Sequence, residues 1–195
     1  MGVSTYFQKI KNEELEKVIN DVDYGFKYIS GVSLSELDYY DQTDDTETIG
    51  QMRDERETYL ETSGNRLMTG YWDVLDYLVV QKDERIKNDT SASTHHIARG
   101  KHPIELFIKH SLERVRYFTS DEVKEVSNYI ISIDFSVLKL RYNPKEFNES
   151  RVYFKHPNWE QNDIDHILSG IKPIFDFYHL SASDNLSLLV HMFLM

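Results

Sequence analysis

The strongest structural signal in this sequence is the stretch Val115-Arg116-Tyr117-Phe118-Thr119-Ser120-Asp121-Glu122. Its first four residues are rich in β-formers and contain no Gly or Pro, which predicts a short strand. The next four have the form of a capping box, in which the Thr119 hydroxyl and the Glu122 carboxylate satisfy each other's backbone amides. The stretch therefore predicts a strand that leads directly into a helix.

The residues that follow continue the helical pattern. Apolar side chains recur at three- and four-residue steps after the box, at Val123, Val126, Tyr129, Ile130 and Ile133. Asp134 is placed to cap a further helix that carries Phe135, Leu138 and Leu140. That helix should stop before Asn143-Pro144, because proline disfavours helical geometry in the residue before it.

The C-terminal part predicts one long helix and one buried strand. Apolar periodicity predicts a helix from Asp163 to about Leu180, with Gly170 and Pro173 weakening or kinking its middle. The segment 186–195 is almost wholly apolar and rich in β-formers, so we expect a buried strand. Between these parts, 151–154 is a further strand candidate.

The N-terminal part predicts a strand and several helices. Residues 3–10 read as a strand, and Asn12 is expected to cap a helix that ends near Asp21. Ser33 or Ser35 is expected to cap a short helix, followed by an acidic loop over 41–50 and a helix over 51–61.

The middle of the chain predicts two more helices around a polar loop. Leu67, Met68, Tyr71, Trp72, Leu75, Leu78 and Val79 recur at helical spacing. Residues 87–100 are small and polar, which is typical of an exposed loop. Pro103 can then open a helix as its first residue.

These elements predict an α+β fold. The chain has 195 residues, 40% of them hydrophobic, and no internal repeat or evident linker. This length suits one domain. We expect a single compact domain over 1–195, with several helices packed on a small mixed or antiparallel sheet.

Charge is distributed unevenly along the chain. The formal net charge is −11, which argues against nucleic acid as the main partner. Residues 33–62 hold ten acids against Arg53 and Arg56, a local net charge of −8, whereas 81–116 has a local net charge of +3 and four histidines. Both segments can be ordinary solvated faces. That reading is favoured; the alternative is that the acidic segment meets a basic protein partner.

The sequence offers no sign of secretion or of a membrane span. It has no cysteine, no basic region followed by an apolar run at its N-terminus, and no stretch near the roughly 20 apolar residues of a spanning helix. These features predict a cytoplasmic location and no membrane partner.

Candidate chemical sites are few. His95, His96 and His102 are the nearest approach to a metal site, but adjacent histidines diverge and a solvated loop is the favoured reading. Residues 41–52 do not match an EF-hand, because Thr46 and Met52 replace its required glycine and glutamate. Glycine-rich phosphate loops and a Gly-x-Ser-x-Gly elbow are absent. We assign no catalytic residue, cofactor or metal from the sequence.

Four further residues have a functional and a structural reading. Trp72-Asp73 can wall a ligand pocket, although a core tryptophan beside a surface acid is favoured. Arg116 and Arg141 can each hold an anion, although pairing with one of the many acids is favoured.

Several of these motifs together resemble the bacterial YfbM-like family of uncharacterised proteins. The resemblance is strongest over 114–195, in the run from Arg116 to Val126, then Ile133-Asp134-Phe135, 142–148, Val152-Tyr153, Trp159 and 175–178. It extends less evenly over 1–80, through Met1-Gly2 and the Trp72-Asp73 helix. The resemblance implies a compact α+β fold in the bacterial cytoplasm, and it brings no established catalytic residues.

Two classes of function remain open at this point. One is a protein-interaction module that uses an acidic face, with an immunity-like protein that masks a basic toxin as a specific form. The other is an enzyme or small-molecule-binding protein whose site uses Arg116, Trp72 or the histidines. A protein without chemistry of its own cannot be separated from the first class by sequence.

Overall fold

The structure is a computed structural model of the chain, and it describes residues 3–43, 46–79, 96–105, 107, 114–149 and 158–194. Within these ranges the strands form one sheet in the order β2-β1-β5-β4-β3, and every neighbouring pair is antiparallel. The strands are β1 Val3–Ile10, β2 Arg66–Thr69, β3 His102–Pro103, β4 Arg114–Phe118 and β5 Ser187–Leu194. The expected α+β class is confirmed, and the sheet is antiparallel rather than mixed.

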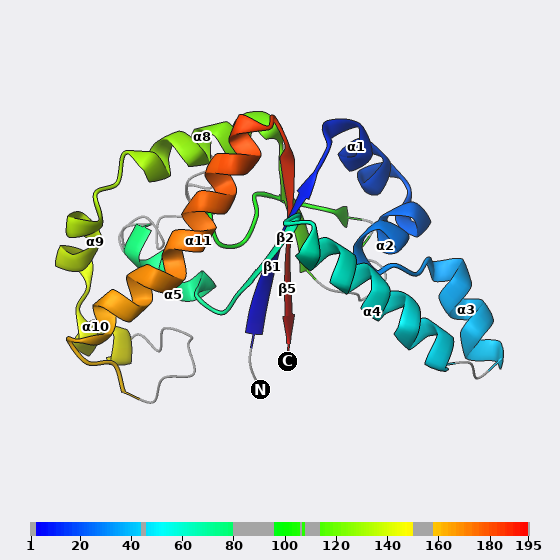
Figure 1. The fold of residues 1–195 in the computed structure, drawn as a ribbon, viewed down its shortest axis with the longest axis horizontal. Helices are drawn as coiled ribbons and strands as arrows, with labels where there is room; N and C mark the ends of the chain where they lie inside the picture. Colours follow the sequence, from blue (N-terminus) through cyan, green and yellow to red (C-terminus); the bar gives the residue numbers. More distant parts are fainter. Residues whose placement is uncertain are drawn as a thin grey trace.

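Helices cover both faces of this sheet (Figure 1). On one side, at the right of Figure 1, are α1 Asn12–Asn20, α2 Val22–Ser30, α3 Leu34–Thr43 and α4 Thr46–Thr62. On the other side are α5 Trp72–Val79, α8 Ser120–Ile131, α9 Phe135–Arg141, α10 Pro144–Glu149 and α11 Asp163–Ser183. The sheet is thus the middle layer of three.

The C-terminal strand β5 lies at the centre of the sheet. It pairs with β1 along its whole length, from Val3 opposite Leu194 to Ile10 opposite Ser187, and with β4 on its other edge. Successive strand side chains point to opposite faces, so Leu188 and Val190 join the core under α11 while Leu189 joins the core under α1 and α2. The predicted buried terminal strand is confirmed, and burial on both faces explains why its sequence is apolar without alternation.

The larger core lies between the sheet and the helices α5, α8 and α11. Tyr178 of α11 is fully buried there, and its ring packs edge-on against Phe7 and Phe118. Its hydroxyl donates a hydrogen bond of 2.7 Å to the carbonyl of Ile97. This bond holds the 96–100 turn inside the core, where Ile97 and Ala98 have no exposed surface.

The predicted helix caps are confirmed where the cap is local. The Thr119–Glu122 capping box is present, with the Thr119 amide 2.9 Å from the Glu122 carboxylate. Asp134 accepts a hydrogen bond from the Ser136 amide at 2.8 Å, and α9 follows as expected. Of the two serines considered for α3, Ser33 makes the cap, since its hydroxyl accepts from the Glu36 amide at 3.2 Å.

The expected Asn12 cap is wrong. Lys11 is the N-cap residue of α1, and no side chain caps this helix. Asn12 instead donates to the Ser120 hydroxyl at 3.2 Å and accepts from the Ser187 hydroxyl at 2.7 Å. Its side chain therefore joins α1 to α8 and β5, which are distant in sequence.

Three expected element boundaries are also wrong. The acidic segment 41–50 is helical at both ends rather than a loop, because α3 continues to Thr43 and α4 begins at Thr46. Leu67 and Met68 lie in β2 rather than at the start of a helix, since β1 supplies their backbone partners. Pro103 lies in β3 rather than at the first position of a helix, and helical geometry is described only from Glu105.

Two helices were not expected, one prediction is wrong in part, and one is not tested. The sequence pattern predicts no element at α2 or α10. The exposed loop predicted over 87–100 lies outside the described residues up to 95, and it is wrong for part of 96–100, where Ile97 and Ala98 are buried in a turn. The strand candidate 151–154 lies outside the described residues altogether.

Candidate functional site

The exposed side of α4 carries a stripe of polar and acidic side chains. It lines an open hollow of about 800 Å³. The residues that line it are Glu47, Gly50, Gln51, Asp54, Glu55, Thr58, Tyr59 and Thr62, which we call the α4 stripe. Their spacing of three and four residues is the spacing of one helix face.

The helical period explains why this stripe has no basic member. Ile49 and Leu60 are buried on the opposite side of α4, so the acids are turned outward. Arg56 is not among the lining residues: it donates to the Tyr28 carbonyl from its Nη2 at 2.7 Å and its Nε at 3.1 Å, and its guanidinium lies 5.6 Å from the ring of Tyr59 at the edge of the stripe. Its guanidinium also lies 5.1 Å from the Tyr28 ring. The described lining therefore contains three carboxylates and no cation.

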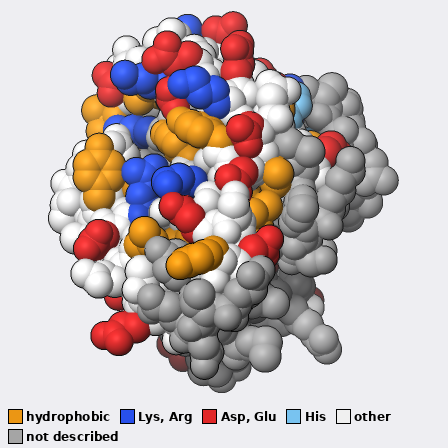
Figure 2. All heavy atoms as spheres, turned by 90° about the vertical axis from the view of Figure 1, so that its right-hand side faces the viewer, with side chains coloured by type: hydrophobic (Ala, Val, Ile, Leu, Met, Phe, Trp, Pro, Cys, Tyr) orange, Lys and Arg blue, Asp and Glu red, His pale blue; other side chains and the backbone are white. Residues whose placement is uncertain are grey.

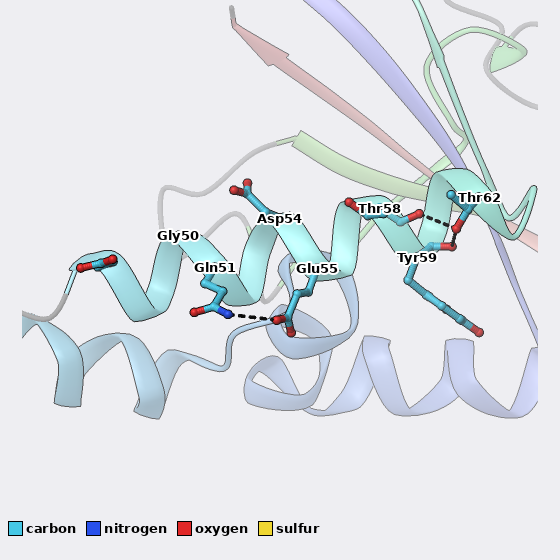
Figure 3. A pocket seen from close by; sticks show the side chains of 8 residues that line it. Gly50, Gln51, Asp54, Glu55, Thr58, Tyr59 and Thr62 are labelled. Atoms are coloured by element: carbon cyan, nitrogen blue, oxygen red, sulfur yellow. Dashed lines mark hydrogen bonds between the residues drawn. The ribbon is translucent and has the colours of Figure 1, made fainter.

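The side chains of the stripe are largely available to solvent. Figure 3 shows Gln51, Glu55 and Tyr59 along one edge of α4, with Asp54 and Thr58 on the other edge. Gln51 donates to Glu55 at 3.3 Å, and the Thr62 hydroxyl bonds the Thr58 carbonyl at 2.7 Å. Tyr59 as a residue is 56% exposed, so it offers apolar surface beside the carboxylates.

Outside the α4 stripe, the acidic side chains of 33–62 are less evenly exposed than the local net charge of −8 implies. On the face in Figure 2, acidic side chains lie around a group of Lys and Arg side chains and form no continuous acidic surface. Glu36, for example, pairs with Lys27 at 2.9 Å. The Ser33 amide, Lys27 and the Ser33 hydroxyl lower the pKa of Glu36 to about 2. Among the described side chains of this segment, those of the α4 stripe place three acids on one solvent-facing side of a helix.

The pair Trp72-Asp73 belongs mainly to the core. Trp72 is buried at the start of α5, as the favoured reading expected. Asp73 is not the surface acid expected beside it, because it is also buried, together with Asp76. Arg99 reaches both carboxylates, at 3.4 Å from Asp73 and 3.0 Å from Asp76. Its guanidinium lies 5.1 Å from the Trp72 ring.

The two candidate arginines bind backbone carbonyls rather than acids. Arg141 donates to the carbonyls of Leu78 at 3.0 Å and Val79 at 3.3 Å, at the C-terminal end of α5. This position suits a cation, because a helix C-terminus has unsatisfied carbonyls and a partial negative charge. Arg116 donates to the carbonyl of Lys101. The expected acid partners are absent for both within the described residues.

The histidines do not form a cluster in the part of the chain that can be described. His95 lies outside the described residues, and His96 belongs to the buried turn. His102 bonds Glu122 at 2.7 Å, and Lys101 bonds the same carboxylate oxygen at 2.8 Å. Across the described ranges, no three His, Cys, Asp or Glu side chains gather closely enough to hold a metal ion.

Sequence reasoning missed the α4 stripe as a unit. The acids of 33–62 were recognised, but the loop assigned to 41–50 interrupted the helix on which Glu47 aligns with Asp54 and Glu55. The signal that could have found it is the three- and four-residue spacing from Glu47 to Thr62.

None of the helices in the described ranges combines the length and apolarity of a membrane crossing.

The fold matches a solved structure of unknown function. Over 97% of this chain and 99% of the other, the structure is similar to a protein of unknown function, YfbM from Escherichia coli, with a TM-score of 0.63 and 15% sequence identity. At that identity the similarity shows the shared fold alone. No curated protein matches the chain.

A family model agrees with this fold and with the resemblance seen in the sequence. The model describes a domain of unknown function, DUF1877, and it matches residues 1–191. The chain belongs to the DUF1877 family.

Proposed function

We propose that this chain is a protein-interaction module, and that the α4 stripe binds a basic segment of a partner protein. The observation that carries the proposal is the run of three solvent-facing carboxylates without a described cation among the lining residues. An immunity-like protein that covers a basic toxin is a specific form of this proposal. A location in the bacterial cytoplasm is part of it too.

The electrostatics favour a basic partner. The net charge of −11 attracts cationic surfaces at long range, and the stripe adds a place where paired charges can form. Exposed ion pairs contribute about 0.2–1 kcal/mol each and weaken with salt. Binding by charge alone would therefore be modest and sensitive to ionic strength.

The exposed Tyr59 adds apolar contact area to the proposed interface, which the carboxylates alone do not provide. Tyrosine is enriched at interface centres, because it buries a large apolar ring and keeps one polar end. At a rise of about 1.5 Å per residue, the stripe from Glu47 to Thr62 is about 22 Å long. An extended partner covering at most about 3.5 Å per residue would contribute about six or seven residues along it.

The test is the binding of a fluorescent lysine-rich peptide, measured by anisotropy at low salt. We expect the variant Glu47→Gln/Asp54→Asn/Glu55→Gln to bind roughly tenfold more weakly, since three exposed ion pairs of about 0.5 kcal/mol each are lost. The control Glu16→Gln/Asp176→Asn/Asp184→Asn removes the same charge from exposed positions on and next to α1 and α11. Equal losses in both variants would show non-specific attraction and contradict the proposal.

A second arm separates the aromatic contribution from the charge. We expect Tyr59→Ala to weaken binding of a lysine-rich peptide that also carries an aromatic residue, and to do so at high salt as well as low. Binding of that peptide unaffected by Tyr59→Ala would remove Tyr59 from the proposed interface.

A further inference from the structure

Arg116 has an unusual environment for a cation in an acidic protein. The sequence contains 33 acidic residues, yet no carboxylate within the described residues pairs with Arg116. Its Nη2 donates to the Lys101 carbonyl, and its Nε is buried without a hydrogen-bond partner. A buried donor without a partner costs about 1–3 kcal/mol, and more for a charged group.

The surroundings make this charge still less favourable. Burial lowers the pKa of Arg116, and the positive charge of Arg99 lowers it further. Both effects oppose the charged form of a side chain that stays protonated in proteins. Within the described residues no carboxylate pairs with Arg116, because the nearby Asp73 and Asp76 bind Arg99 instead.

Gly100 lets the turn that carries Arg99 pack directly against Arg116. Its φ of +77° is in the left-handed region, where an L side chain is disfavoured. A Cβ at this position would lie 2.7 Å from the Arg116 Cβ and 3.3 Å from the Arg116 carbonyl carbon. Only glycine allows the 96–100 turn to lie directly on β4 at Arg116.

Arg99 is held in a fixed orientation but remains accessible. Asp73 and Asp76 bind its Nη2, and its guanidinium faces the Trp72 ring. Nevertheless, 44% of its side chain is exposed. Solvent therefore reaches part of this side chain while the protein sets the position of its guanidinium.

We propose that Arg99 and Arg116 together bind a phosphate-class oxyanion, either free or as the phosphate of a small molecule. Each guanidinium group presents a planar fork of N–H donors that matches phosphate oxygens. Two guanidinium groups carry two positive charges, so they suit a phosphate dianion better than they suit a singly charged carboxylate ligand. The anion would supply the negative charge that Arg116 lacks. Lys101 is not part of this site, because it pairs with Glu122.

Isothermal titration of the wild-type protein tests the site directly. The probes are inorganic phosphate, glycerol phosphate as a phosphomonoester, and acetate, all at one low ionic strength. We expect saturable binding of at least one phosphate probe, and acetate at least tenfold weaker. Tighter binding of glycerol phosphate would identify an esterified ligand, and tighter binding of inorganic phosphate a free anion. No saturable binding of either phosphate probe, or acetate binding as tightly, would overturn the proposal.

Variants assign the binding to the arginine pair. We expect Arg116→Gln to bind phosphate at least tenfold more weakly, Arg116→Lys to be intermediate, and Arg53→Gln, on exposed α4, to match wild type. Should Arg116→Gln fail to fold, the buried Nε–H of Arg116 in wild-type protein can be followed by NMR. Its resonance should shift on titration with phosphate; an unchanged resonance, or wild-type affinity in Arg116→Gln, would contradict the assignment.

Discussion

Single residues have their largest effects in this protein where two segments approach closely. Gly100 and Gly64 both have positive φ, at +77° and +67°. A Cβ at Gly100 would meet Arg116 and Val190, whereas a Cβ at Gly64 would meet nothing within 4 Å. Comparing the same substitution at these two glycines therefore separates the cost of backbone strain from the cost of steric overlap.

We expect Gly100→Ala to be much more destabilising than Gly64→Ala. Left-handed strain costs roughly 1–2 kcal/mol at either position, and overlap adds about 1–3 kcal/mol at Gly100. Urea unfolding monitored by circular dichroism measures both. Equal losses in the two variants would show that the turn can move away from β4.

Glu122 should make stability depend on pH. Burial alone would raise its pKa, but Lys101, the Thr119 amide and His102 together lower it to about 2 from 4.5. Because the folded pKa is below the ordinary value, the stabilisation is present above about pH 4.5 and is lost as the pH falls toward 2. We expect Glu122→Gln to cost about 2 kcal/mol at about pH 6, and less at about pH 3.

Urea unfolding of wild type and Glu122→Gln at both pH values measures this difference. The variant Glu16→Gln, an exposed acid on α1, controls for the loss of one charge. A cost that stays constant between the two pH values would contradict the role given to the ionised Glu122.

At the scale of elements, α5 depends on residues far away in sequence for its C-terminal cap. Arg141 bonds the carbonyls of Leu78 and Val79, and the Tyr129 hydroxyl bonds Val79 at 3.0 Å. The two side chains share one acceptor, so their contributions should not be independent.

We expect Arg141→Met to cost about 1–3 kcal/mol and Tyr129→Phe about 1 kcal/mol in free energy of unfolding. The double variant should differ from the sum of the single variants by at least about 0.5 kcal/mol, since both change the environment of the Val79 carbonyl. A double-mutant cycle by urea unfolding measures this. Simple additivity would show that the two bonds act separately.

The same distinction between local and distant partners decides which elements the sequence could predict. The helix after Thr119 and the helix after Asp134 were predictable, because their caps involve residues two or three positions apart. β2 was not, because Leu67 and Met68 have helical spacing and become a strand only through pairing with β1. The start of α4 at Thr46 was not predictable, because the residues of 41–50 have too little apolar content to show a helical period.

The candidate sites follow the same rule. The acids of the α4 stripe were visible in sequence, but their alignment needed the helix boundary. The pairing of Arg99 with Asp73 and Asp76 joins residues more than twenty positions apart, so sequence gave no sign of it. Arg116 is a candidate in the sequence, but that no acid among the described residues pairs with it becomes apparent only in the fold.

For the whole molecule, the central claim is that the α4 stripe, rather than the net charge in general, binds a basic partner. NMR titration of isotopically labelled protein with the lysine-rich peptide tests this most directly, because each assigned amide reports its own position. The account predicts shifts concentrated between Glu47 and Thr62 and largely abolished in Glu47→Gln/Asp54→Asn/Glu55→Gln. Shifts spread evenly over exposed acids on α1, α8 and α11, or unchanged in that variant, would contradict it.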